Sequence, residues 1–309
     1  MTDGMVIRSF LLHKPIGKSF VFDSLNNIEE KATTPEQTNK KFDKFFHKVS
    51  CNFLHFIRNV LWNLSNWKND KLKEFIDDFN PDIIFAPCYG NKFMCRLTRF
   101  TQKITNKKVI SYISDDSYTL KQINFSIFYW INRFSVRRQL RKTFPYYSLC
   151  YTMTERQKFQ CEKNFHANMK ILLKPVDVVC DALKTEVNNP IKIVYAGGIY
   201  LNRWKTLKKL VDAIKEVNKN EQKIILDIYT GNFISKKINK CLNDGFNSVI
   251  HDKVSSKELF DIYKNSDIAL HVESFDLKNR LAVRMSFSTK ITDCLSSGCA
   301  VMAICDSKQ

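Results

Sequence analysis

The second half of the chain alternates short apolar runs with longer amphipathic stretches, and this alternation is its most constraining feature. The stretch after the first run repeats apolar residues at the spacing of one helical face: Leu207, Leu210, Val211, Ile214 and Val217. The apolar runs fall at residues 191–197, 223–229, 247–250, 267–272 and 300–304. Strands that alternate with helices form a parallel sheet with helices on both faces, so the order predicts an α/β domain.

The first half shows the same alternation less regularly. Its apolar runs fall at residues 82–86, 108–113, 148–152 and 170–175. We therefore expect an α/β fold of two Rossmann-like domains facing a cleft, one at 1–180 and one at 190–309. Residues 176–190 have no clean period and end in Asn-Asn-Pro, which is typical of a linker.

The pattern of residues 24–80 predicts polar helices, with a loop at 32–39. In the second half, Ser255 and Glu258 predict a capping box, and a later helix is predicted to open at Ser288 and close at Gly298. The chain stops soon after its last strand, and no strand with a glycine-rich turn opens it. We therefore expect both ends to be incomplete.

Composition excludes some classes and suggests a negatively charged partner. With 44% hydrophobic and 26% charged residues, the chain matches no disordered or collagen-like class. The net charge of +18 favours phosphates, anionic lipids or nucleic acid, although a diffuse lysine excess marks no site by itself. The ten cysteines lie singly and no run reaches 18 apolar residues. We expect free thiols in a cytoplasmic protein that is soluble or lies on a membrane surface.

Two clusters of residues have the chemistry of a diphosphate site. Gly197 and Gly198 end the first strand of the second half, and Arg203 and Lys205 follow at the start of the next helix. Glycine lets the backbone approach a ligand closely, and the two cations suit a diphosphate. An ordinary turn followed by a solvated basic helix start fits the same residues.

The second cluster lies around the helix predicted to open at Ser288. Ser288, Thr289 and Lys290 stand at its amino end, where free backbone N–H groups favour an anion. Asp293 follows about one turn later, within reach of a ribose, and Glu273 ends the preceding strand. Each residue alone is more often a cap or an exposed carboxylate, but their combination favours a nucleotide site.

Several longer runs resemble a known family. GGIYLNRWKTLKKLVDAI, LDIYTGN, HDKVSSKELFDIYKNSDIALHVESF and RMSFSTKITDCLSSGCAVMAI stand in the same order as in the nucleotide-binding domain of GT-B glycosyltransferases. The similarity covers about residues 191–305 and points to family 4 enzymes of bacterial capsule, O-antigen and other surface polysaccharide biosynthesis. The first half is similar more loosely, through NPDIIFAPCYG and VISYISDDSYT.

The resemblance implies transfer of a sugar, of hexosyl type, from a nucleotide-sugar donor to an acceptor hydroxyl, without metal or other cofactor. It places Arg203 and Lys205 on the donor diphosphate. Asp293 matches the second of two acids separated by seven residues, which holds the ribose. The first acid falls at Met285, a departure from the pattern, so Glu273 is expected to supply the missing charge.

Asp115 and Asp116 follow the strand at 108–113, and two adjacent acids after a strand are similar to a metal-binding acidic motif. We do not expect a metal site, and two interpretations stay open for Asp116. It contacts the donor sugar or the acceptor, or it serves only as a turn and cap residue.

Residues 125–142 combine aromatic rings with five Arg or Lys, which suits a helix in a lipid headgroup layer. Such a helix fits a polyprenyl-linked glycan acceptor and a peripheral position on an anionic inner membrane face. A core-facing helix with a basic outer face fits as well, and residues 42–67 are open to the same two interpretations.

Two other functions compete with glycosyl transfer. The chain is either a catalytically inactive nucleotide-sugar-binding protein, which Met285 favours, or a basic nucleic-acid-binding protein. Dispersed basic residues and the lack of a recognised binding module argue against nucleic acid.

Overall fold

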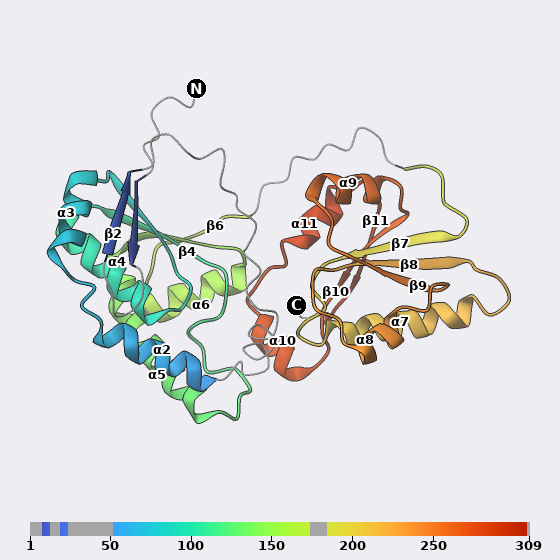
Figure 1. Cartoon of the computed structure of the whole chain (residues 1–309), viewed down its shortest axis with the longest axis horizontal. Coiled ribbons are helices and arrows are strands. Elements are labelled where there is room, and N and C mark those ends of the chain that lie inside the picture. The colour runs from blue at the N-terminus through green and yellow to red at the C-terminus, as the bar shows by residue number, and fades with distance from the viewer. Residues whose placement is uncertain (1–7, 13–18, 24–51, 174–183, 308–309) are drawn as a thin grey trace, which may run out of the picture. The chain divides into compact units, whose positions relative to one another are not determined.

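The computed structural model describes residues 8–12, 19–23, 52–173 and 184–307 (Figure 1). The chain forms two compact units. The first holds the chain up to Leu120 and Asn124–Ile171, and the second holds Lys121–Ile123 and the chain from Leu172 onward. The loop expected at 32–39 and part of the expected linker, residues 174–183, lie outside the described residues.

The first unit is built on a parallel four-stranded sheet in the order β3-β4-β5-β6, at the places where the sequence predicts strands. The strands are β3 (Ile83–Pro87), β4 (Lys108–Ile113), β5 (Tyr147–Thr152) and β6 (Met169–Ile171). The helices that connect them are α4 (Lys92–Thr105), α5 (Ile127–Thr143) and α6 (Glu155–Phe165), with a 3-10 turn at Phe144–Tyr146. Apolar faces of these helices and the sheet enclose one core that includes Val109, Leu140 and Cys150.

Two more helices and a hairpin complete the first unit. Helices α2 (Asn52–Leu64) and α3 (Asp70–Phe79) fall within the region predicted to be helical. The strands β1 (Arg8–Leu12) and β2 (Ser19–Asp23) form an antiparallel pair that the sequence analysis did not predict.

The second unit contains a parallel five-stranded sheet in the order β11-β10-β7-β8-β9. The strands are β7 (Ile191–Ala196), β8 (Ile224–Tyr229), β9 (Ser248–His251), β10 (Ile268–Val272) and β11 (Ala300–Ile304). The helices are α7 (Arg203–Val217), α8 (Lys236–Leu242), α9 (Ser256–Lys264), α10 (Leu277–Val283) and α11 (Lys290–Leu295). All five predicted strands are confirmed.

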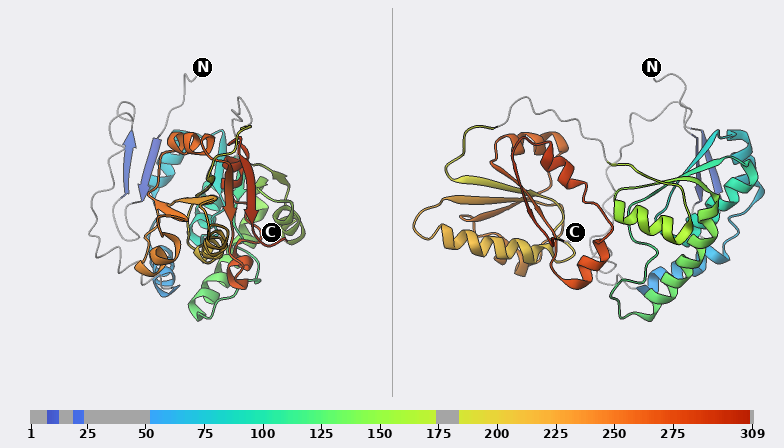
Figure 2. Two further views of the ribbon diagram at one scale, coloured as in Figure 1. Left: turned by 90° about the vertical axis from the view of Figure 1, so that its right-hand side faces the viewer. Right: turned by 180° about the vertical axis from the view of Figure 1, so that it is seen from behind.

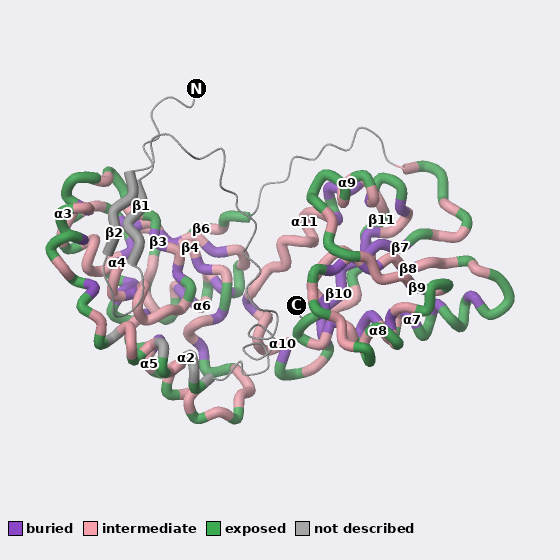
Figure 3. Tube along the Cα trace, in the orientation of Figure 1, coloured by how far each residue is buried: buried purple, intermediate pink, exposed green. Residues whose placement is uncertain are grey.

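Alternate residues of β7 serve opposite faces of this sheet. Ile193 and Tyr195 pack with Leu207 of α7, whereas Val194 packs with Tyr263 of α9 and Cys294 of α11. Helices α7 and α8 therefore cover one face, and α9 and α11 cover the other, as Figure 2 shows from two sides. The central strands β7 and β10 are mostly buried between them, whereas the edge strand β11 is mostly exposed (Figure 3). Helices on both faces were predicted, and this prediction is confirmed.

The segment between β10 and β11 differs from the prediction in detail. It holds two short helices, and α11 begins at Lys290 with Thr289 as its N-cap instead of opening at Ser288. The carbonyl of Ser288 accepts a bond from the amide of Ile291, three residues on, so regular helical bonding starts late. Gly298 is left-handed as predicted, with φ of 77°.

Two local predictions concern caps and thiols. The capping box of Ser255 and Glu258 is confirmed, since each side chain bonds the backbone N–H of the other residue. The eight cysteines within the described residues have free thiols. No helix in the described part of the chain combines the length and apolar character that crossing a bilayer requires.

Candidate functional site

Four elements of the second unit bring the predicted site residues to one edge of its sheet. Gly197 follows β7, and Glu273 follows the neighbouring strand β10, so both lie at the carboxyl ends of adjacent parallel strands. Arg203 opens α7 and Lys290 opens α11. The carboxyl edge of a parallel sheet is where α/β proteins usually bind ligands.

Arg203 and Glu273 form a forked ion pair. The Arg203 Nε donates to Glu273 Oε2 at 2.9 Å, and its Nη2 donates to Oε1 at 2.7 Å. Both side chains are buried, and the Thr206 hydroxyl donates to the Glu273 carbonyl at 2.8 Å. The pair joins the start of α7 to the end of β10, and its two charges largely cancel.

Lys290 is the second cation at this edge of the sheet, and both oxygens of Glu273 already accept hydrogen bonds from Arg203. Its side chain lies against Gly197, where an added Cβ would stand 2.4 Å from Nζ. Burial lowers the pKa of the Lys290 ammonium, Arg203 lowers it further, and Glu273 opposes the shift. No carboxylate among the described residues hydrogen-bonds Lys290. A half-buried cation beside a second cation is a site where an anion is stabilised.

His271 belongs to the same buried group. Its Nε2 lies 3.5 Å from Glu273 Oε1 at the end of β10. Burial lowers the pKa of His271; Glu273 opposes this, and Arg203 and Lys290 add to it. His271 is therefore neutral near pH 7 and adds no charge to the site.

The turn between β7 and α7 is held in a strained conformation. Leu201 and Asn202 both have positive φ, 56° and 62°, which is costly for a branched residue such as leucine. Neighbouring side chains hold it through three hydrogen bonds, Tyr195 Oη to the Gly198 carbonyl at 2.7 Å, the Ile199 amide to Asn232 Oδ1 at 2.8 Å, and Asn279 Nδ2 to the Leu201 carbonyl at 2.7 Å.

The two glycines of this turn let neighbouring side chains lie close to the backbone. A Cβ at Gly198 would stand 2.2 Å from the Tyr200 ring, just as one at Gly197 would meet Lys290. Gly197 thus leaves room for the Lys290 side chain, whereas Gly198 leaves room for the Tyr200 ring.

Lys205 lies at the exposed side of the site. Its Nζ is 3.1 Å from Asp276 Oδ2, and both side chains are substantially exposed. Hydrogen bonds from Asn202 and Lys205 lower the pKa of Asp276. An exposed ion pair of this kind stabilises the fold by at most about 1 kcal/mol. Lys205 can therefore leave Asp276 and pair with another anion at little cost.

The remaining predicted residues of this half lie on and before α11. Ser288 and Thr289 precede the helix, and Asp293 lies three residues after Lys290 and is partly buried. Met285, at the position of the first expected acid, is 3% exposed and lies beside the Arg284 guanidinium. A methionine stands there in place of a carboxylate, so Asp293 is the acid of the expected pair that the chain retains.

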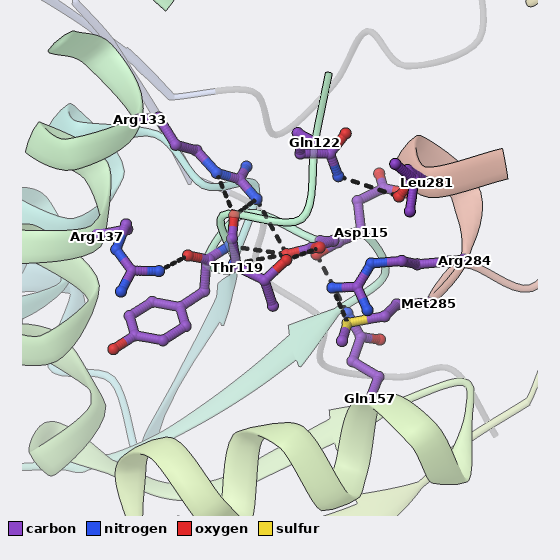
Figure 4. Close-up of polar contacts among 11 residues, drawn as sticks. Asp115, Thr119, Gln122, Arg133, Arg137, Gln157, Leu281, Arg284 and Met285 are labelled. Carbon is purple, nitrogen blue, oxygen red and sulfur yellow. Dashed lines mark hydrogen bonds and ion pairs between the residues drawn. The ribbon is translucent and has the colours of Figure 1, made fainter. Parts of the chain in front are cut away.

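Asp116 lies in the first unit, in a hydrogen-bonded network on the loop after β4 that includes Thr119 and Arg133, both labelled in Figure 4. Its carboxylate accepts from the Thr119 amide at 2.8 Å and from the Thr119 hydroxyl. Arg133 Nη2 pairs with it at 3.0 Å and also donates to the Thr119 carbonyl at 2.7 Å. Asp116 is buried, so these bonds hold the loop on α5.

Sequence reasoning missed the polar residues that fix the strained turn: Asn202, Asn232, Asp276 and Asn279. Each lies within a few residues of a strand end or opens a helix, where Asn and Asp commonly bond backbone groups. Their positions near strand ends and helix starts could therefore have indicated from the sequence that they bond the backbone of the turn.

His251 is the last residue of β9. Its Nε2 lies 2.7 Å from Asp227 Oδ1, and its ring stacks on Tyr229 with centroids 4.5 Å apart.

Within the described ranges, no group of three or more His, Cys, Asp or Glu residues is arranged so that it could hold a metal ion.

Comparisons with known proteins bear on the fold. No protein-family model and no curated protein matches the sequence. Solved structures do match. TarM matches 75% of this chain with a TM-score of 0.50 and 10% identity, over 43% of its own length. Sucrose-phosphate synthase from Thermosynechococcus elongatus matches 76% with a TM-score of 0.51 and 12% identity, over 58% of its length.

A third structure, trehalose-6-phosphate from E. coli bound with UDP-2-fluoro glucose, matches 76% of this chain and 61% of its own length, with a TM-score of 0.52 and 12% identity. The chain has the GT-B fold. It spans about half the length of these GT-B structures, and at this identity the likeness is one of fold. The predicted fold class of two Rossmann-like α/β units is confirmed.

Proposed function

We propose that the chain is a glycosyltransferase that moves a sugar, of hexosyl type, from a nucleotide diphosphate sugar to an acceptor hydroxyl without a metal ion. The observation that carries the proposal is the half-buried Lys290 ammonium lying over Gly197 at the carboxyl edge of the second sheet. A GT-B fold with an unneutralised cation at this edge suits a diphosphate.

The chemistry follows from where negative charge develops. Breaking the bond between the anomeric carbon and the diphosphate leaves the electron pair on the diphosphate oxygen. Lys290 stabilises that charge, and its partial burial strengthens the interaction because the surroundings screen it less than water does. Lys205 adds a second cation by leaving Asp276, a change that costs little at an exposed pair.

Arg203 and Glu273 act as positioning residues in this proposal. Their buried forked pair is difficult to open, since a lone charge left behind would be strongly destabilised. The pair fixes the start of α7, and with it Lys205 and the turn at Gly198. Glu273 is fully engaged by Arg203, so we assign it no contact with the sugar.

The nucleoside end of the donor is assigned to α11 and the segment before it. We propose that Asp293 holds the ribose hydroxyls and that the backbone around Ser288 and Thr289 lies along the diphosphate. TarM has been solved with UDP, and the E. coli structure holds UDP-2-fluoro glucose, which makes UDP the first nucleotide to test.

Of the two interpretations that the sequence leaves open for Asp116, we propose the structural one. Because its carboxylate already binds Thr119 and Arg133, we propose that it holds the loop after β4 and contacts neither the donor nor the acceptor. The acceptor we propose is a glycan or a polyprenyl-linked glycan. The free thiols of the described cysteines favour a cytoplasmic location.

The test is calorimetric titration of the purified chain with UDP. Lys290→Ala should weaken UDP binding about 10- to 100-fold, the effect of losing a hydrogen bond to a charged group. The matched control is Lys219→Ala, which removes one exposed lysine of the same unit and should leave the affinity unchanged. Equal affinities for wild type and Lys290→Ala would reject the site.

A second measurement separates a transferase from a protein that only binds nucleotide sugars. Release of UDP from UDP-glucose, with and without an oligosaccharide acceptor, should be detected for the wild type and abolished in Lys290→Ala. Tight UDP binding with no release under any acceptor would contradict the transferase and leave a binding protein.

A further inference from the structure

Helices α2 and α5 lie side by side in the first unit (Figure 1). The ring of Phe128 on α5 has its centroid 5.0 Å from that of Phe53 on α2, and Asn59 Nδ2 donates to Asn132 Oδ1 at 2.6 Å. Trp62, on the opposite side of α2 from the exposed residues, packs against Phe93 of α4 with ring centroids 4.4 Å apart and the rings tilted. The pair is thus anchored on the unit and has one outer surface.

That outer surface is apolar on both helices. On α2 the exposed residues recur on one face: Phe53, Ile57, Val60 and Leu64. On and just before α5 they are Phe125, Ile127, Ile131 and Phe134. Phe134 is 54% exposed and Phe125 is 99% exposed. Because a large exposed apolar patch is uncommon on a monomer, we expect this one to be covered in use.

The basic residues of α5 divide between two sides of the helix. Arg133 and Arg137 turn inward and donate to the carbonyls of Thr119 and Tyr118 (Figure 4). Arg138 and Lys142 lie one and two turns beyond Phe134 and are exposed. No described residue hydrogen-bonds or ion-pairs with either of them. The outer surface is therefore apolar at the start of α5 and cationic at its end.

Acidic residues are missing from the sequence of this surface. No Asp or Glu occurs at residues 44–69 or at residues 117–154. Two copies of such a surface would bring like charges together, which disfavours self-association. An acidic protein partner would find only Arg138 and Lys142 among the exposed cations named on this surface. A nucleic acid would pair with these cations but would leave the exposed apolar side chains in contact with water.

We infer that this surface, the α2–α5 face, docks on an anionic lipid headgroup layer. The apolar residues enter the boundary between headgroups and acyl chains, while Arg138 and Lys142 bind lipid phosphates. Neither helix spans the bilayer; both lie along it. The inference adds a membrane partner to the proposed function, but it does not depend on the donor site, since docking needs no sugar transfer.

The experiment is co-sedimentation of the full chain with large vesicles of phosphatidylcholine, with and without phosphatidylglycerol. The wild type should bind the anionic vesicles. Ile131→Ser with Phe134→Ser should reduce the partition coefficient at least about tenfold, because two large side chains no longer enter the lipid. The matched control is Phe159→Ser on α6, whose ring is 64% exposed in the same unit and should not matter.

A second variant tests the charges. Arg138→Gln with Lys142→Gln should weaken binding to anionic vesicles about tenfold or more and reduce its dependence on salt. Binding to neutral vesicles should change little. UDP affinity, measured on every variant, should equal that of the wild type, so a failed docking surface and a failed donor site give different results.

Several outcomes would overturn the inference. One is absence of binding to anionic vesicles, and another is an equal loss in Phe159→Ser. A dimer that Ile131→Ser with Phe134→Ser converts to monomer would make the surface a self-association site. RNA binding lost in Arg138→Gln with Lys142→Gln, without vesicle binding by the wild type, would assign it to nucleic acid.

Discussion

Both sheets carry charged residues just beyond the carboxyl ends of their strands, yet the two sites differ in how these charges are paired. After β4, Asp116 is enclosed by Thr119 and Arg133. After β7 and β10, Arg203 and Glu273 pair with each other and Lys290 remains without a carboxylate partner among the described residues. The position in the fold is the same, so it is the pairing that separates a loop anchor from a candidate ligand site.

The largest expected effect comes from breaking the paired site. Arg133→Met removes the guanidinium that lies 3.0 Å from the buried Asp116 carboxylate, and we expect the free energy of unfolding to fall by about 3 kcal/mol. Urea denaturation measures this. Arg138→Met is the control on the same helix and should change stability by less than about 0.5 kcal/mol. Equal small changes in both variants would mean that the Asp116 network is not an anchor.

Lys290→Met should act with the opposite sign. Removing a half-buried cation that sits beside Arg203 relieves repulsion and desolvation, so stability at pH 7 should stay the same or rise by about 1 kcal/mol. UDP affinity, measured in parallel by calorimetry, should fall. A loss of stability as large as that of Arg133→Met would show that Lys290 is a structural residue.

A smaller effect is expected from Gly197→Ala. The new methyl group would meet the Lys290 ammonium, the far end of a flexible side chain that can move aside. Stability should change by less than about 1 kcal/mol, and UDP affinity should fall about three- to tenfold as the cation is displaced. The control is Gly231→Ala, whose Cβ would meet the side chain of Lys253 at 3.4 Å, an ordinary contact. Unchanged UDP affinity in Gly197→Ala would mean that the Lys290 ammonium, in the position next to Gly197, does not contact UDP.

Sequence periodicity predicted the strands and most helices of both units because a parallel sheet buries short β-branched runs and leaves amphipathic stretches to cover it. It missed the hairpin of β1 and β2, and it predicted one helix where α10 and α11 stand. Helices of six and seven residues are too short to show a period, so their bounds depend on tertiary packing.

The site was predictable in its location and less so in its pairing. Spacing from strand ends indicated Gly197, Arg203, Glu273 and Lys290, since strand ends of a parallel sheet meet at one edge. Which carboxylate pairs with which cation depends on side-chain directions from different elements. For this reason Glu273 was expected to supply the charge missing at Met285, whereas the structure joins both of its oxygens to Arg203.

The smallest effect concerns the protonation of His271, which lies beside the unpaired cation and has no counterpart at Asp116. Burial keeps the pKa of His271 below its value of about 6.5 in an unfolded chain. Below that pH the unfolded state binds more protons than the folded state, so stability falls as pH decreases through this range and levels off once the folded histidine is also protonated. Denaturation of the wild type and of His271→Gln between about pH 5 and 8 measures this loss of stability. The variant should lose part of the slope that the wild type shows. Identical slopes would mean that burial and the neighbouring cations do not lower the pKa of His271, and the contrast between the two sites would then rest on ligand binding alone.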